Sequence, residues 1–322
     1  MSKRIISQVA RGLAIPARIV FNIITGRNLP RMSRASEWSI GIYQGSSPFY
    51  LSDSPEFQNP VLTAAQVTDV KADFVADPFM IKEGTTWHMF FEVMNSLNGK
   101  GEIGLATSGD GRKWTYQNIV LREPFHLSYP FIFKWQDDHY LIPESGTANR
   151  IALYKAKNFP CVWEYAATLL EGQFADHSIF HHQNIWWLLV CSNTQPYDNL
   201  RLFHADNLTG PWHEHIKSPI VRDNACIARP AGRTLAINNQ FVRFAQDCST
   251  TYGSKVNAFL IDKLSKTDYH ELPFAGNPIL KPGRAAWNMH GMHHLDACEL
   301  NLGEWIACVD GYKRKLMLKA EY

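Results

Sequence analysis

The sequence has no uninterrupted apolar run of the ~18 residues that a membrane-spanning helix needs. Its first residues also lack the apolar centre and the small-residue cleavage site of a secretory signal. The six cysteines form no CxxC pair, and most of them lie in apolar, strand-like runs, which is typical of reduced core thiols. These absences predict a cytoplasmic protein.

A strong net charge is also missing, because 32 Lys and Arg residues stand against 30 Asp and Glu residues. This balance gives no argument for a nucleic-acid partner. The charge is uneven, however, since seven basic residues precede the first acidic one, Glu37: Lys3, Arg4, Arg11, Arg18, Arg27, Arg31 and Arg34. We predict a basic N-terminal arm over residues 1–37, helical around residues 3–25. It would either lie on an anionic surface at the inner membrane or pack against the side of the following domain.

A short pattern recurs five times along the rest of the chain. Its aligned positions are separated by 52, 47, 53 and 64 residues, close to the length of one four-stranded propeller blade. The segments are VADPFMI (75–81), LSYPFIF (127–133), FADHSIF (174–180), IARPAGR (227–233) and GMHHLDA (291–297). Each is followed by a turn and a second apolar run, as in a β-hairpin.

The repeat predicts an all-β fold, a five-bladed β-propeller of four-stranded blades over residues 38–322. An aromatic content of 12% agrees with a strand-rich protein. The last repeat has room for only about two strands, and the strand-like stretch 38–51 is too short for a blade of its own. We therefore expect this N-terminal stretch to complete the last blade and close the ring.

The innermost strands of a propeller line its central channel, so equivalent residues of the five segments should face one another. These residues are Asp77, Tyr129, Asp176, Arg229 and His293, with Arg233 and His294 as alternatives in the last two segments. Glu92 and Glu144 each follow the ring position of their own blade by 15 residues. Because a hairpin returns the end of its second strand to the start of its first, we expect both glutamates at the same mouth.

Four carboxyl groups are thus predicted to cluster: Asp77, Glu92, Glu144 and Asp176. Such groups repel, so some must be protonated, paired with an arginine or bound to a cation. Glycosidic chemistry uses this arrangement, since one protonated carboxyl group donates to the leaving oxygen while another activates water or attacks. We expect Asp77 to act as base or nucleophile, Glu144 as general acid and Asp176 as an orienting partner. The alternative is that these residues cap turns and form stabilising ion pairs.

Further residues are predicted to contact a substrate: Glu92, Tyr129, His177, Arg229, Arg243, His293 and His294. Trp135 and Trp287, near turn or loop ends, are the candidates for stacking on a sugar. No spacing matches a structural zinc site, and we assign no metal ligand. An axial cation such as calcium remains compatible with the oxygen-rich surroundings.

The motifs VADPF, SYPFIF with YLIPES, FADHSIF, ARPAG and GMHHLDA resemble the N-terminal domain of plant glucosamine inositolphosphorylceramide transferase and its bacterial relatives. More distantly, they are similar to the five-bladed propeller glycoside hydrolases of families 43 and 32. That likeness implies catalytic roles for Asp77 and Asp176. It also implies a glutamate on blade four or at a blade start, where this chain has IARPAGR.

These observations predict a carbohydrate-active protein with a glycoside-hydrolase-like site in the propeller mouth. If it is an enzyme, it cleaves or transfers glycosidic bonds of a glycan or glycolipid precursor. The alternative is a non-catalytic sugar-binding or scaffold module that serves a partner glycosyltransferase.

Overall fold

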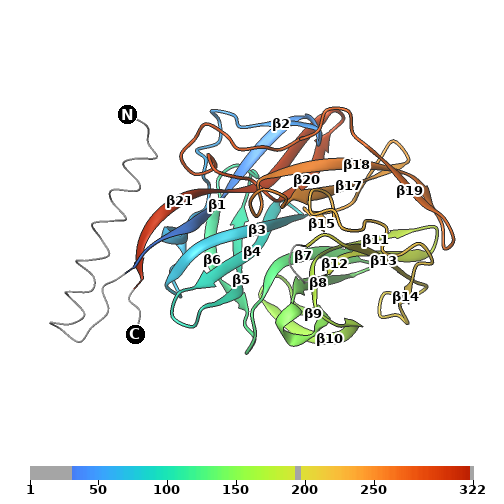
Figure 1. Cartoon of the computed structure of the whole chain (residues 1–322). Helices are drawn as coiled ribbons and strands as arrows, with labels where there is room; N and C mark the ends of the chain where they lie inside the picture. Colours follow the sequence, from blue (N-terminus) through green and yellow to red (C-terminus); the bar gives the residue numbers. More distant parts are fainter. Residues whose placement is uncertain (1–30, 193–196, 320–322) are drawn as a thin grey trace, which may run out of the picture. The chain divides into compact units, whose positions relative to one another are not determined.

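The structure, a computed structural model, describes residues 31–192 and 197–319 (Figure 1). Residues Trp38–Lys313 form one compact unit. Within it, strands of four sheets follow one another in chain order, and the fifth sheet joins the two ends of the chain. The predicted five-bladed propeller is therefore confirmed.

Blade one contains β3 (Ala72–Glu83), β4 (Thr86–Asn95), β5 (Lys100–Ser108) and β6 (Thr115–Leu121). Blade two contains β7 (Ser128–Trp135), β8 (Asp138–Glu144), β9 (Arg150–Asn158) and β10 (Val162–Glu171). Blade three contains β11 (Phe174–His182), β12 (Ile185–Ser192), β13 (Leu200–Ala205) and β14 (His213–Glu214).

Blade four contains β15 (Arg229–Pro230), β16 (Leu235–Ile237), β17 (Gln240–Asp247), β18 (Lys255–Leu264) and β19 (Tyr269–Pro273). Blade five has the order β2 (Tyr50–Ser52), β1 (Arg31–Ser47), β21 (Glu304–Lys319) and β20 (Leu295–Asn301). The N-terminal stretch thus completes the last blade, as its length predicts. Two short 3-10 turns, Ala64–Gln66 and Gly146–Ala148, are the helical elements of the described residues.

The predicted helix around residues 3–25 lies outside the described residues. At the end of the predicted arm, residues 31–37 belong to β1, so the strand begins earlier than position 38. Lys315 of β21 pairs with Glu37 of β1 at 3.1 Å, and the two strands are neighbours in the sheet. A partner strand distant in sequence thus gives this polar segment its extended form. No helix among the described residues is long and apolar enough to cross a membrane.

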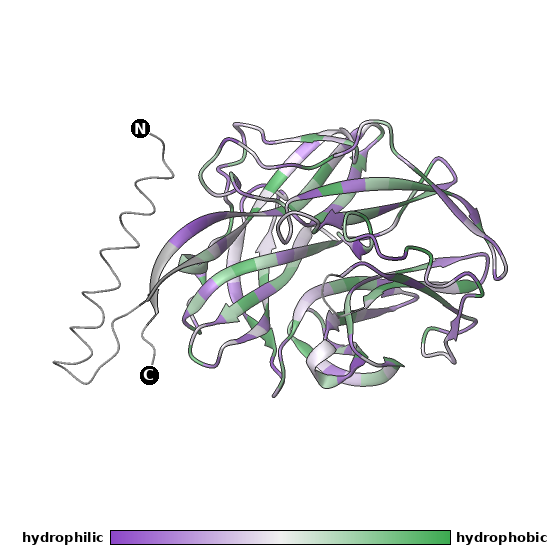
Figure 2. Cartoon of the chain, viewed as in Figure 1, coloured by the Kyte–Doolittle hydropathy of each residue, from purple (hydrophilic) through white to green (hydrophobic). Residues whose placement is uncertain are grey.

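Apolar side chains hold the blades together. Figure 2 shows hydrophobic residues interspersed with hydrophilic ones along the strands. Phe79 of blade one and Phe131 of blade two, both fully buried, lie 5.1 Å apart between ring centroids. The fourth and fifth blades are joined by a backbone hydrogen bond from Leu295 to Ala231, 2.9 Å long. Contacts of this kind leave the inner strands facing a common axis.

One buried ion pair links four blades below the mouth. Arg233 binds Asp296 at 2.9 Å and donates to the backbone oxygen of Ile132 on β7. Asp296 also accepts the backbone N–H of Met80 on β3, at 2.8 Å. The Asp296 side chain is only 3% exposed, so its charge depends on these donors.

We predict that Asp296→Ala lowers the free energy of unfolding by about 3–5 kcal/mol, because it leaves Arg233 and a buried N–H without their acceptor. Denaturation by urea, followed by tryptophan fluorescence, measures the loss. The matched control is Asp206→Ala, which removes an exposed aspartate paired with Lys266 and should leave stability nearly unchanged. Equal effects of the two substitutions would contradict a structural role for the Asp296 pair.

Candidate functional site

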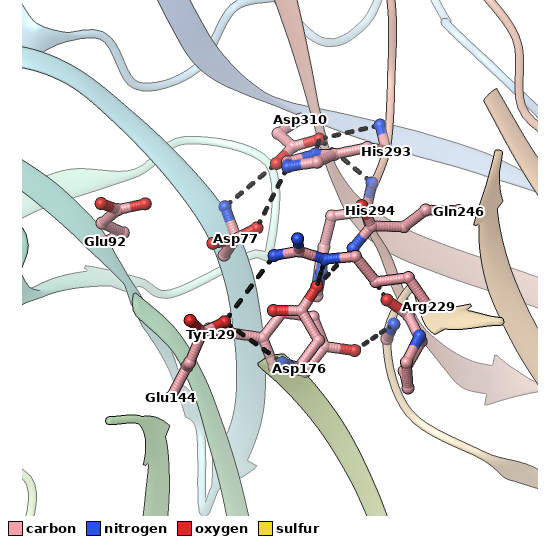
Figure 3. Close-up of polar contacts among 12 residues, drawn as sticks. Asp77, Glu92, Tyr129, Glu144, Asp176, Arg229, Gln246, His293, His294 and Asp310 are labelled. Atoms are coloured by element: carbon pink, nitrogen blue, oxygen red, sulfur yellow. Dashed lines mark hydrogen bonds and ion pairs between the residues drawn. The ribbon is translucent and has the colours of Figure 1, made fainter. Parts of the chain in front are cut away.

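Three inner strands carry the same backbone irregularity at the predicted ring position. Asp77, Tyr129 and Asp176 have positive φ values of 53°, 46° and 39°. In each blade the strand register shifts at this residue, which is the mark of a β-bulge. Such a conformation is uncommon for residues other than glycine and clusters at functional sites. Three separate sheets thus present a residue to the same mouth (Figure 3).

The two glutamates lie where the hairpin argument predicts. Glu92 is paired across the strands with Ala76, and Glu144 with Ser128, each next to the bulged residue of its own blade. Glu92 is 6% exposed, and the Glu144 side chain is 13% exposed. The predicted set of four clustered carboxyl groups is therefore present.

At two of the bulges, a carboxyl group of the preceding blade accepts a hydrogen bond from the backbone N–H of the bulged residue. The backbone N–H of Asp176 donates to Glu144 of blade two, at 3.1 Å, and the N–H of Asp77 donates to Asp310 of blade five, at 3.0 Å. Glu92 has the equivalent place in blade one, but it lies 3.5 Å from the ring Nε2 of His126. These contacts connect neighbouring blades around the mouth.

Asp176 is the best-supported anion of the cluster. Its Oδ2 accepts hydrogen bonds from Arg229 Nε at 2.6 Å and from Gln246 Nε2 at 2.5 Å. Burial alone would raise its pKa, but Arg229, together with a hydrogen bond from Glu144, holds the pKa below the usual range. Burial and the charge on Asp176 raise the pKa of Glu144 well above its ordinary value, so Glu144 keeps its proton.

Asp310 binds the residues of the mouth that come from blades one and five. It is fully buried and accepts three backbone N–H groups, from Asp77, His293 and His294, and the Nδ1–H of His293 at 2.7 Å. The second ring nitrogen of His293 lies 3.5 Å from Asp77. Burial opposes the positive charge on His293, but Asp310 and Asp77 outweigh it and raise its pKa. Asp310 and His293 therefore form an ion pair next to Asp77.

Asp310 and Gln246 are absent from the residues predicted from the sequence. Asp310 follows the second apolar run of its repeat, in WIACVD, as Glu92 and Glu144 follow theirs. That position is the signal that could have identified Asp310. His126 lies between two repeats, where no periodic pattern identifies it.

The pKa values of the other two acids, Asp77 and Glu92, are both raised. Burial, only partly offset by His293, raises the pKa of Asp77 from 3.8 to about 7. Burial and the surrounding carboxylates raise the pKa of Glu92 well above its ordinary value. Asp77 is thus poised to gain or lose a proton close to neutral pH.

Several predicted residues lie outside this cluster. Arg243 forms an ion pair with Glu271 of β19 and binds the backbone oxygen of Ile227, so it supports blade four. His177 donates to the backbone oxygen of Ile142, and burial lowers its pKa to about 4. The hydroxyl group of Tyr129 accepts the N–H of Gly232 across the channel.

The alternatives in the last two segments are resolved. Arg229 and His293 join the carboxyl cluster, whereas Arg233 binds Asp296. His294 is fully buried against Phe79 and Tyr129, and neither of its ring nitrogens has a hydrogen-bond partner. Burial lowers its pKa to about 4, so the ring is neutral.

One further group of residues has the composition of a metal site. Asp77, His293 and Asp310 offer ligand atoms within 4.8 Å of one another. Yet Asp310 already accepts four hydrogen bonds, and the His293 nitrogen that faces it is the donor of one of them. Two of the three residues, Asp310 and His293, are thus paired with each other without an ion, so we assign no metal to this group.

Aromatic rings border the mouth. The guanidinium of Arg229 lies 4.5 Å from the ring centroid of Tyr197 and 5.0 Å from that of Tyr252. Trp38 stacks on His293 at 4.1 Å. An aromatic border around buried carboxyl groups is a common design for binding a small polar molecule with apolar faces.

The fold is a five-bladed propeller similar to that of solved glycoside hydrolases. The α-L-arabinanase of Cellvibrio cellulosa is 18% identical, with a TM-score of 0.54 over 77% of this chain and 95% of its own. The α-L-arabinofuranosidase catalytic domain of Coprinopsis cinerea is 12% identical, with a TM-score of 0.58 over 86% of this chain and 97% of its own. At these identities the likeness shows the fold.

Sequence comparison gives the family. Residues 31–312 match the family described as glucosamine inositolphosphorylceramide transferase 1, N-terminal, and the chain belongs to this family. The rice transferase 1 (Oryza sativa subsp. japonica) is 37% identical over an alignment of 295 residues that covers 85% of this chain. The Arabidopsis thaliana protein is 34% identical over an alignment of 303 residues that covers 87% of this chain. The chain spans about 40% of the length of these relatives. The resemblance predicted from the five motifs is confirmed.

The two aspartates should respond to pH in different ways. Because native Asp77 keeps its proton up to about pH 7 while the unfolded chain loses it near pH 4, this group lowers stability progressively between those values. We predict that the stability of Asp77→Asn relative to the wild type rises from pH 4 to pH 7 and then levels off.

Asp176→Asn is the matched comparison. Because the pKa of Asp176 is lower in the native state than in the unfolded chain, its ionised carboxylate stabilises the native state at pH values above the unfolded pKa. This stabilisation is lost as the pH falls below the unfolded pKa. The stability deficit of Asp176→Asn should therefore stay constant from about pH 5 to pH 7. Urea denaturation at five pH values tests both variants. Parallel curves for Asp77→Asn and the wild type would contradict the proposed protonation of Asp77.

Proposed function

We propose that this protein acts on glycosidic bonds of a glycan or glycolipid precursor at the propeller mouth. The observation that carries the proposal is the opposite protonation of neighbouring carboxyl groups, since Glu144 keeps a proton beside ionised Asp176. Pairs of titratable groups whose surroundings push their pKa values apart are typical of acid–base sites.

Glu144 would be the general acid. A general acid must carry its proton at the working pH, and both burial and the charge of Asp176 favour the protonated form of Glu144. Asp176 accepts a hydrogen bond from Glu144 while Arg229 holds it in place, which suits an orienting role. Proton donation to the leaving oxygen would follow from this arrangement.

Asp77 would be the base or nucleophile. It must be ionised for either role, and its pKa of about 7 places that change near neutral pH. His293, held by Asp310, faces Asp77 and stabilises its ionised form. Activity should therefore rise as the pH passes through 7, provided that Glu144 remains protonated.

The chemical class of the substrate is suggested by the relatives. Their name, glucosamine inositolphosphorylceramide transferase, refers to a glycolipid. We propose a sugar or glycolipid ligand for this chain as well. The basic residues of the N-terminal arm would bring it to an anionic membrane surface on the cytoplasmic side, near a glycosyltransferase partner.

One observation favours a second function, a non-catalytic sugar-binding module. The likeness to hydrolases implies a glutamate on blade four, and here Arg229 stands at the start of β15 and binds Asp176. Glu144 also satisfies the backbone N–H of Asp176, which is a structural task. A site that binds sugar without turnover would be compatible with both contacts.

We predict that Asp77→Asn lowers turnover by a factor of about 10²–10⁴ while sugar binding changes little, because the amide keeps the shape of the side chain but cannot accept a proton. Turnover is measured on a panel of nitrophenyl glycosides and of nucleotide sugars with lipid acceptors, and binding by calorimetry. Glu164→Gln, an exposed glutamate on β10, is the control.

The two functions give different results in this experiment. Turnover that disappears in Asp77→Asn supports the enzyme. Wild-type binding without turnover on any member of the panel supports the module. Turnover that persists in Asp77→Asn contradicts the role assigned to Asp77.

A further inference from the structure

One exposed aromatic ring, that of Tyr252, lies next to two residues of the carboxyl cluster, Arg229 and His293. Tyr252 belongs to the loop between β17 and β18 on blade four and is 44% exposed. The guanidinium of Arg229, which holds Asp176, lies 5.0 Å from the centroid of this ring. The ring also meets His293, the neighbour of Asp77, at 5.3 Å between centroids. Tyr252 therefore lies next to the partners of both aspartates, Arg229 beside Asp176 and His293 beside Asp77.

The loop holds this ring in a fixed place. Asp247 accepts the backbone N–H and the hydroxyl group of Ser249 on its carboxylate, and its backbone oxygen accepts two hydrogen bonds from Ser254. Gly253 has a φ of 62°, and a Cβ at this position would lie 2.8 Å from His293 Cβ. The glycine thus lets the loop backbone approach the site more closely than any other residue would.

The ring of Tyr252 stays accessible to a ligand, since the residue is 44% exposed although Tyr197 also lies near it, 6.4 Å away between ring centroids. Arg229 covers one side, and Trp38 meets Tyr252 nearly at right angles, with interplanar angle 87° and centroids 6.3 Å apart. The tryptophans predicted as stacking residues do not offer such a face. Trp287 is 5% exposed, and Trp135 packs against His181 and Trp186.

We propose that Tyr252 is a stacking subsite at the entrance to the carboxyl cluster. Its aromatic ring would contact the less polar face of a pyranose ring. The proposal rests on the proposed sugar function and adds the residue and the ring form that it recognises. A rigid, preorganised aromatic side chain binds at little entropic cost, and contact with apolar C–H groups supplies the free energy. The carboxyl cluster would then meet the polar edge of the same sugar.

We predict that Tyr252→Ala weakens the binding of methyl pyranosides, including methyl glucosaminide, by roughly tenfold. Tyr252→Phe and Tyr252→Trp, which keep a ring face, should stay within about twofold of the wild type. A titration monitored by saturation-transfer NMR measures the affinity and shows which sugar protons contact the protein. Tyr50→Ala is the matched control, since Tyr50 is an exposed tyrosine, 65% exposed, on the outer strand β2.

Each outcome decides the proposal. Wild-type binding that Tyr252→Ala leaves unchanged overturns the stacking subsite, while the proposed sugar function stands. Loss of binding in Tyr252→Phe as well would assign the effect to the hydroxyl group and overturn stacking too. Absence of both binding and turnover in the wild type would overturn the proposed function and this subsite together. Thermal melting of each variant confirms that it is folded, as the exposure of Tyr252 leads us to expect.

Discussion

The propeller mouth contains two buried cations and five carboxyl groups, and this imbalance determines which of the carboxyl groups are protonated. Arg229 and His293 are the cations, and each supports one carboxylate, Asp176 and Asp310 respectively. The pKa values of these two acids are lowered, whereas those of the other three are raised. Charges that cannot be paired in a dry interior are avoided by protonation. The cluster therefore holds protons that chemistry can use.

The propeller fold supplies the geometry of this cluster through its bulges. A bulge leaves one backbone N–H outside the strand ladder, and at Asp77 and Asp176 a carboxylate from the preceding blade accepts it. The positive φ values at these positions cost of order 1–3 kcal/mol each and persist because the surrounding structure fixes them. The same contacts thus join neighbouring blades and aim the acidic side chains, so stability and site geometry depend on each other.

The sequence alone predicts those parts of the protein that repeat. Five similar segments give the blade count, and the interval of 15 residues places Glu92 and Glu144 beside the ring. The partners of these residues are harder to predict, because they come from different blades at irregular positions. Arg243 and Gln246 illustrate this difficulty, because both lie on β17. Gln246 binds Asp176, whereas Arg243, the residue predicted from the sequence, binds Glu271. Tyr252 lies in a loop, where no periodicity marks it.

The hydrogen bonds separate structural carboxyl groups from those available to a ligand. Asp310 accepts four donors and Asp176 is bound by Arg229 and Gln246, so neither can change partners without disturbing the frame. Asp77 faces His293 at 3.5 Å, and Glu92 lies at the same distance from His126, both longer than a normal hydrogen bond. These two acids, whose pKa values are raised, are the groups that a sugar hydroxyl or amine can engage at the smallest structural cost. Recognition is therefore expected to begin on blade one, with Tyr252 of blade four on the opposite border of the mouth.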